Sequence, residues 1–254
     1  MNGERNAGER GRINPFRLLR DLGDVVETRD IEIATGHDRK TATETLSRWA
    51  KAGYVKPFAS GVFFNLVRNP SSPQTHVFEA ATRTVRRPML LIGASALAAA
   101  GWTTQMPAGY ELAIPTDRNI RGWKRMEGIS AEARPVGWFA SVVPHAIGGG
   151  LRDFDRLPPA LALVDAIASA ERFSELGREE RKARLRNATV TWHPDPDDIC
   201  VPGDMEPHDM WKALEEAAEI LDYPLDKVRR YAAGIPDLAD SVNGRDGKRP
   251  APAP

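Results

Sequence analysis

Residues 28–67 read TRDIEIATGHDRKTATETLSRWAKAGYVKPFASGVFFNLV, and this stretch decides the fold of the N-terminal part of the chain. Thr28 can cap a first helix, which Gly36 can end in a left-handed conformation. Asp38 can cap a second helix that reaches Ala52. The apolar residues of this second helix recur at helical spacing and form one stripe: Ala42, Leu46, Trp49 and Ala50. The pattern predicts two packed helices joined by a glycine turn.

A β-hairpin is predicted directly after these helices. Residues 55–58 and 62–67 are rich in β-branched and aromatic side chains, and the connection between them ends in Gly61, which suits a left-handed turn position. A short helix over residues 15–21 precedes the whole stretch. The order helix, helix, glycine turn, helix and hairpin within residues 14–68 predicts a winged helix-turn-helix. The helix capped by Asp38, which is the third along the chain, would enter the major groove of DNA.

Side chains suited to nucleic acid gather at the start and on the outer face of the third helix and in the hairpin. Arg48 can bond guanine or grip a phosphate, and Glu44 can accept a hydrogen bond from a cytosine amine. The lysines supply attraction to phosphates without sequence preference. The predicted DNA-binding residues are His37, Arg39, Lys40, Thr41, Glu44, Ser47, Arg48, Lys51, Lys56 and Ser60. The alternatives are an ordinary solvated helix face and a winged helix used for protein interaction.

The charge distribution also separates the two parts of the chain. The chain has 254 residues and no net charge, but residues 1–87 hold 15 Lys and Arg against 10 Asp and Glu, whereas residues 88–254 hold 20 against 25. Within residues 195–222 there are ten carboxylates and a single lysine. This division favours a small module for a polyanion joined to a larger body that avoids it.

The predicted domain organisation follows from these shifts in composition. Residues 69–73 have loop chemistry, and the block after them combines strands with helices that dominate late in the sequence. The fold class is therefore predicted as α+β. The expected parts are a disordered N-terminus at 1–13, the winged helix at 14–68, a linker at 69–87, a larger α+β domain at 88–239 and a disordered tail at 240–254.

Composition excludes several classes of protein. The single cysteine, Cys200, excludes a disulfide framework and fits a reducing compartment. Residues 88–110 carry no charge, but glycines and polar residues interrupt them too often for a membrane span. The N-terminus lacks the apolar core of a secretory signal. A cytoplasmic protein without membrane association is expected.

Enzymatic chemistry finds little support in the sequence. The segment 90–101 resembles the opening of a nucleotidyltransferase fold, but the next strand offers Glu111 and Asp117, six residues apart, in place of a closely spaced carboxylate pair for Mg²⁺. Residues 148–150, three glycines, lack the lysine of a P-loop and are interpreted as a flexible joint. The acidic and histidine-bearing stretch from residue 193 lacks metal-ligand spacing. We expect no catalysis, no cofactor and no metal.

A basic helix in the second domain is a candidate partner surface. Its residues are Arg178, Arg181, Lys182, Arg184 and Arg186. They suit contact with DNA, with an acidic partner protein or with the chain's own acidic run. A solvated helix face is the alternative.

Three segments together resemble a known family. Residues 53–58 (GYVKPF) and 61–64 (GVFF), followed by residues 91–102 (LIGASALAAAGW), resemble the AbiEi-type antitoxins of bacterial type IV toxin–antitoxin systems, and the resemblance covers roughly residues 14–235. It implies a transcriptional autorepressor that binds repeats in its own promoter, and a C-terminal domain that counters a nucleotidyltransferase toxin, with or without direct contact. It implies no catalytic residues. The alternative is an ordinary winged-helix regulator with a ligand-sensing or protein-interaction domain. Either is expected to occupy DNA as a dimer, because one such module binds tightly when two copies address two half-sites.

Overall fold

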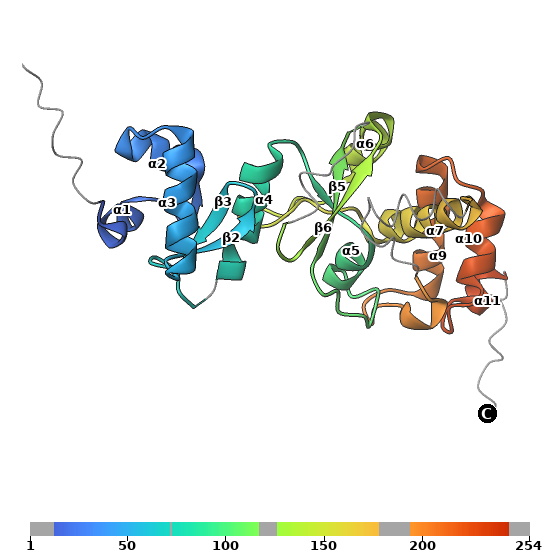
Figure 1. Ribbon diagram of the computed structural model, residues 1–254. Helices are drawn as coiled ribbons and strands as arrows, with labels where there is room; N and C mark the ends of the chain where they lie inside the picture. Colours follow the sequence, from blue (N-terminus) through green and yellow to red (C-terminus); the bar gives the residue numbers. More distant parts are fainter. Residues whose placement is uncertain (1–12, 72, 117–125, 178–193, 244–254) are drawn as a thin grey trace, which may run out of the picture. The chain divides into compact units, whose positions relative to one another are not determined.

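A computed structural model describes most of the chain and divides it into two units (Figure 1). The described residues are 13–71, 73–116, 126–177 and 194–243. The units are Met1–Arg86 and Arg87–Pro254, and each is described by itself. Helices hold 50% of the described residues and strands 15%, in small sheets, so the predicted α+β class is confirmed.

The first unit packs helices against a small antiparallel sheet. Its described elements are α1 (Pro15–Asp21), β1 (Val25–Glu27), α2 (Thr28–Thr35), α3 (Arg39–Lys51), β2 (Val55–Ala59), β3 (Val62–Asn65), the 3-10 turn η1 (Pro73–His76) and α4 (Val77–Val85). The sheet has the order β1-β3-β2. Strand β1, which the sequence analysis did not predict, pairs with β3 and sets Glu27 opposite Val62. The core between helices and sheet is apolar and includes Leu19, Ile31, Leu46, Trp49 and Val55.

Local sequence signals explain the ends of these elements. The Asn14 side chain accepts hydrogen bonds from two backbone N–H groups at the start of α1. Gly36 has φ +67° where α2 ends, and Gly61 has φ +77° in the turn between β2 and β3. These two glycines occupy the left-handed region, which costs other residues energy. The predicted glycine turn and hairpin are therefore present, with β3 ending at Asn65 rather than at Val67.

The prediction of a linker over residues 69–87 is wrong for its second half. Helix α4 occupies Val77–Val85 and contacts β1 and β3. Val77 and Val85 are buried, together with two alanines between them. The Pro- and Ser-rich stretch before this helix is typical of a linker, which explains why a linker was predicted here. Its buried face packs on β1 and β3, and the first unit ends at Arg86.

The second unit combines a three-stranded sheet with helices. Its described elements are β4 (Leu90–Leu91), α5 (Gly93–Ala99), β5 (Tyr110–Pro115), β6 (Ile129–Arg134), α6 (Val136–Val142), η3 (Val143–His145), α7 (Pro159–Glu175), η4 (Pro196–Asp198), α9 (Pro207–Ile220), α10 (Leu225–Ala232) and α11 (Ala239–Val242). The sheet has the order β4-β5-β6, antiparallel between β4 and β5 and parallel between β5 and β6. Strand β6 ends at Arg134, because Pro135 precedes the start of α6.

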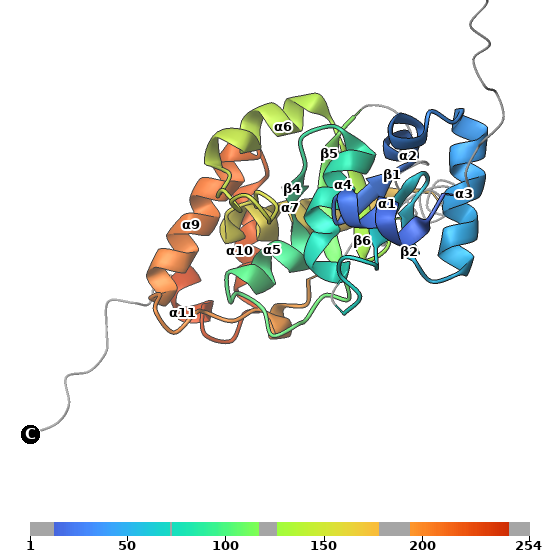
Figure 2. The ribbon, with the colours of Figure 1, turned by 90° about the vertical axis from the view of Figure 1, so that its left-hand side faces the viewer.

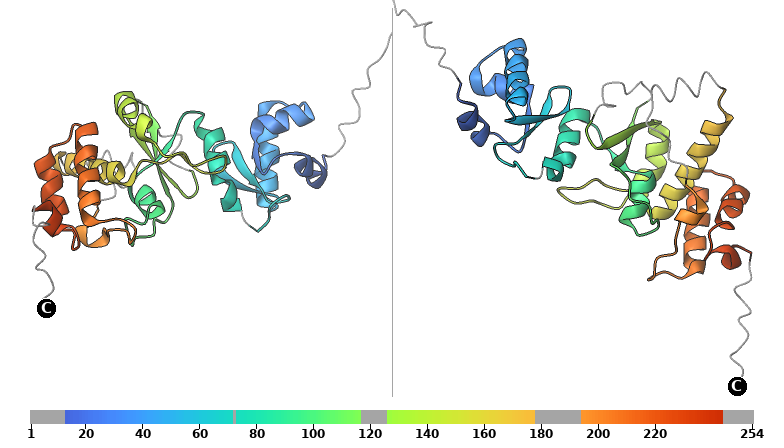
Figure 3. Two further views of the ribbon diagram at one scale, coloured as in Figure 1. Left: turned by 180° about the vertical axis from the view of Figure 1, so that it is seen from behind. Right: turned by 60° about the horizontal axis from the view of Figure 1, so that its bottom comes forward.

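The predicted concentration of helices late in the chain is confirmed. Helix α9 contacts α7, α10 and α11, and α7 also contacts α5 (Figures 2 and 3). Trp102, Met210 and Leu214 lie in this core with almost no exposure. The predicted tail from residue 240 begins too early, because α11 extends to Val242, which is buried. Residues 244–254 of that tail, and residues 1–12 of the predicted disordered N-terminus, lie outside the described residues.

Residues 148–150, interpreted from the sequence as a flexible joint, include a close backbone contact at Gly149. Gly149 donates its backbone N–H to the Asp155 carboxylate at 3.0 Å. A Cβ atom at Gly149 would lie 2.1 Å from the Phe154 carbonyl oxygen, so a side chain there would clash with backbone. The run of glycines permits a close backbone approach, which a side chain would prevent.

Among the described residues, no helix is both long and apolar enough to cross a membrane.

Candidate nucleic-acid interface

Helix α3 is held by a cap at its start and by a buried stripe along its inner side. The Asp38 carboxylate accepts a hydrogen bond from the Thr41 backbone N–H at 2.8 Å. That bond is the main reason why the pKa of Asp38 lies below its ordinary value. Ala42, Leu46 and Trp49 are buried against the rest of the unit. The helix therefore presents its opposite side to solvent in one defined orientation.

The outer side of α3 carries five of the ten predicted DNA-binding residues. They are exposed: Lys40, Glu44, Ser47, Arg48 and Lys51. In the described part of the chain, no carboxylate lies within ion-pair distance of Lys40, Arg48 or Lys51. Arg48 donates one hydrogen bond, to the Thr45 hydroxyl at 3.2 Å. The face therefore presents three cations that are available to an external anion.

Other predicted residues are less accessible. His37 is half-buried in the turn between α2 and α3, and its Nδ1 is buried without a hydrogen-bond partner in the described structure. The Thr41 side chain is partly buried, and Lys56 is half-buried on β2. These three residues flank the outer face of α3, so the structure does not gather all ten predicted residues on one surface.

Arg39 and Ser60 lie instead at a cleft beside the outer face. The cleft has a volume of about 330 Å³. Its walls come from the start of α2, the hairpin turn, the start of α3 and the end of α4. The lining residues are Glu27, Thr28, Arg29, Glu32, Arg39, Ser60, Gly61, Val62, Arg83, Thr84 and Arg86.

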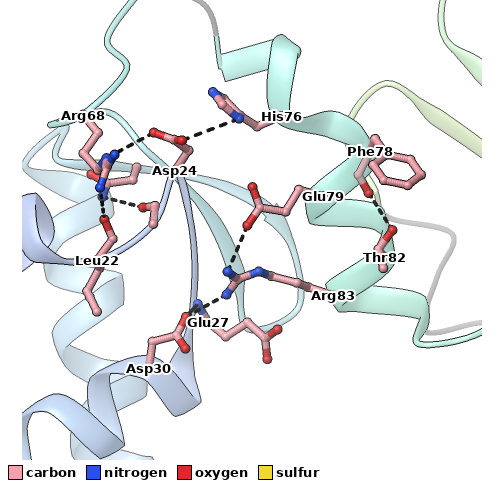
Figure 4. Close-up of polar contacts among 12 residues, drawn as sticks. Leu22, Asp24, Glu27, Asp30, Arg68, His76, Phe78, Glu79, Thr82 and Arg83 are labelled. Carbon is pink, nitrogen blue, oxygen red and sulfur yellow. Dashed lines mark hydrogen bonds and ion pairs between the residues drawn. The ribbon is translucent and has the colours of Figure 1, made fainter. Parts of the chain in front are cut away.

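Ion pairs hold α4 in place along this cleft. Arg83 lies between two carboxylates, 3.0 Å from Asp30 and 2.9 Å from Glu79 (Figure 4). Arg86 lies 2.6 Å from a Glu27 carboxylate oxygen. Each of these pairs is partly exposed, and such pairs contribute little to stability by themselves. Their effect here is positional, because they fix two arginine side chains at the wall of the cleft.

The sequence analysis missed three of the four arginines at the cleft. Arg29 precedes the predicted recognition helix, and Arg83 and Arg86 lie in the segment interpreted as a linker. The packing of α2 on α3, and of α4 on β1 and β3, brings these positions together with Arg39. The one available signal was the presence of an arginine in the first turn of α2, where a helix favours acidic residues.

The second unit contains the residues considered for nucleotidyl transfer. Glu111 accepts a hydrogen bond from the Ala94 backbone N–H at 2.7 Å and so caps α5. Burial raises the pKa of Glu111 although the backbone hydrogen bonds act to lower it. A Cβ atom at Gly93 would meet this carboxylate at 2.2 Å. Glu111 thus has a structural role at the helix start, while Asp117 lies outside the described residues.

The candidate partner surface and the acidic stretch are the two remaining features predicted from the sequence. The basic residues of the candidate partner surface, Arg178, Arg181, Lys182, Arg184 and Arg186, lie outside the described residues. In the acidic stretch, Asp195 caps η4 and Asp198 accepts a hydrogen bond from Gln105. Within the described ranges, no group of three or more potential ligands is arranged for a metal ion.

No protein-family model matches the chain, and no curated protein matches it. The family resemblance described from the sequence therefore stays a prediction. The functional argument rests on the geometry of the first unit.

Proposed function

We propose that the protein is a transcriptional repressor whose first unit binds double-stranded DNA as a winged helix-turn-helix. The observation that carries this proposal is the outer face of α3, where Lys40, Arg48 and Lys51 are exposed and none has a carboxylate partner within the described residues. Helix α2 packs against α3, and the hairpin β2–β3 follows it. In this class of module, the second helix of such a pair lies in the major groove.

The residues of α3 would then divide the work. Arg48 and Glu44 are long enough to reach base edges, where arginine pairs with guanine and glutamate accepts from cytosine. Lys40 and Lys51 lie near the two ends of α3 and would contact phosphates, which fix orientation without reading sequence.

Two substitutions separate these roles. Lys51→Gln is expected to weaken binding to all duplexes alike and to reduce the salt slope by about 1. Arg48→Ala is expected to cost about 1–3 kcal/mol on the operator and less on random DNA, if it reads a base. The measurement is fluorescence anisotropy with the DNA upstream of the gene and with a random duplex, over a salt series.

Arg20→Gln is the matched control, because Arg20 is an exposed arginine on α1, outside the α3 face. It removes the same charge and is expected to leave the affinity nearly unchanged. The repressor proposal fails if the wild-type chain shows no preference for the upstream DNA over random duplex at about 150 mM salt, a concentration at which weak surface attraction is largely screened.

We further propose that the second unit counters a nucleotidyltransferase toxin, as the resemblance to AbiEi-type antitoxins implies. The separate apolar core of this unit supports a separable task. The full chain, coexpressed with a nucleotidyltransferase encoded beside its gene, is expected to relieve growth arrest. The variant carrying Arg48→Ala and Lys51→Gln is expected to protect equally while losing repression.

The outcome of that experiment also tests the alternative function. A folded chain that represses its promoter but gives no protection would contradict the antitoxin proposal. A shift in operator affinity on addition of a small molecule would then favour an ordinary regulator with a ligand-sensing second unit.

A further inference from the structure

We propose that the cleft lined by Arg29, Arg39, Ser60, Arg83 and Arg86 binds a phosphate of the DNA backbone and so forms a second anchor beside the α3 face. The proposal deepens the proposed function, since it assigns the phosphate to DNA. It extends the contact surface to α2 and α4, which the recognition-helix argument does not include.

The four arginines at the cleft are of two kinds. Arg83 and Arg86 are already paired with carboxylates and form a wall. Arg29 and Arg39 are exposed, and within the described part of the chain neither has a carboxylate at ion-pair distance. The free pair comes from two different helices but faces the same space. An arginine's planar fork of donors matches the oxygens of a phosphate.

The electrostatics of the cleft favour an anion. Arg83 and Arg86 are paired with carboxylates, so neither adds net positive charge. The remaining charges of the lining are those of Arg29 and Arg39 against Glu32, a formal excess of +1. Arg29 and Arg39 each lie in the first turn of a helix, where the helix dipole is positive and a cation is disfavoured. Without a ligand, these charges repel each other and the helix ends. A bound phosphate would remove that repulsion.

The size and surroundings of the cleft fit a backbone phosphate. A volume of about 330 Å³ is roughly ten times the ~30 Å³ share of one water molecule, so the cleft admits a phosphate with part of its sugar. The Ser60 hydroxyl in the hairpin turn can donate to a phosphate oxygen. Arg39 is the first residue of α3. The cleft therefore adjoins both elements that we propose to lie on DNA, which favours DNA over a soluble anion as the ligand.

The test compares Arg29→Gln, Arg39→Gln and the double variant with Arg20→Gln as the control of equal charge change. Each cleft substitution is expected to weaken binding to operator and to random duplex by the same factor, because a phosphate contact carries no sequence information. Each is also expected to lower the salt slope by about 0.9, so that the affinity lost between 50 and 200 mM salt shrinks by about threefold per arginine. Thermal melts by circular dichroism check that the variants fold.

A double variant that binds both duplexes as tightly as the Arg20→Gln protein, while Arg48→Ala is weakened, overturns the cleft assignment and leaves the repressor proposal standing. A wild-type chain that binds no DNA overturns both.

A second arm separates the two sources of phosphate. The arginine Nε–H resonances of the full chain are followed by NMR while inorganic phosphate replaces chloride at constant ionic strength. Saturable shifts of the Arg29 and Arg39 signals, together with the DNA effects above, support the proposal. Such shifts without any loss of DNA affinity in the variants would assign the cleft to a soluble phosphate compound and overturn the DNA assignment.

Discussion

Replacing Asp165 with alanine is expected to lower the free energy of unfolding of the second unit by about 3–5 kcal/mol, because it leaves a buried charge without its partner. The Arg134 side chain on β6 is 8% exposed, and its Nη2 lies 2.7 Å from the Asp165 carboxylate on α7, which is 3% exposed. The same carboxylate accepts a hydrogen bond from Trp138 Nε1 at 3.0 Å. The Asp165 side chain on α7 thus contacts both Arg134 on β6 and Trp138 on α6.

Arg134 cannot relieve the loss by giving up its proton. Burial acts to lower its pKa, but the carboxylates of Asp165 and Glu132 outweigh burial and hold the pKa above its ordinary value. Arginine stays charged in proteins even without such help. After the substitution, the guanidinium would keep Glu132, whose side chain is 23% exposed, and the hydroxyl of Ser169 at 3.0 Å. These contacts do not replace the buried carboxylate.

Urea denaturation followed by tryptophan fluorescence measures this effect, since Trp138 reports on the network itself. Lys227→Gln is the control, because it breaks a comparably short ion pair, 2.6 Å from Lys227 to Glu171, that lies on the surface. The control is expected to shift the midpoint little. An Asp165→Ala shift as small as that of the control would contradict the prediction. Replacing both partners, Arg134→Met with Asp165→Leu, is expected to recover much of the loss.

Periodicity and turn chemistry were sufficient to predict the central part of the first unit. Gly36 and Gly61 marked two left-handed positions, and the stripe through Leu46 and Trp49 marked the buried side of α3. Such signals are local, so neighbours in the sequence carry them. Strand β1 has three residues, too few to show alternation, and its pairing with β3 depends on a segment more than 30 residues away.

One part of the candidate site was predictable from the sequence and the other part was not. The exposed face of α3 follows from the helical spacing of its buried residues. The cleft does not, because it brings Arg29, Arg39, Ser60 and Arg86 together from four elements. Arg86 lay in a segment that the Pro- and Ser-rich stretch before it led us to interpret as a linker. A basic residue becomes part of a site only through packing that no local pattern encodes.

Removing α4 from the first unit is expected to abolish its cooperative folding. The fragment of residues 1–86 should melt cooperatively and bind the operator, whereas residues 1–75 should do neither. Val77 and Val85 are buried, and a fully buried valine contributes about 1.5–3 kcal/mol. Two such residues approach the lower end of the 5–15 kcal/mol that separates folded from unfolded domains. The shorter fragment would also expose the faces of β1 and β3 that α4 contacts.

Circular dichroism melts and operator affinity of the two fragments measure this difference. We expect the loss of cooperative folding to come from the lost apolar burial of α4 and not from its lost ion pairs. Arg83→Gln in residues 1–86 separates these two causes. It removes the contacts to Asp30 and Glu79 but keeps the buried face, so only a small drop in melting temperature is expected. If residues 1–75 melted as cooperatively as residues 1–86, α4 would be an appendage, and the wall that it gives to the arginine cleft would lose its structural basis.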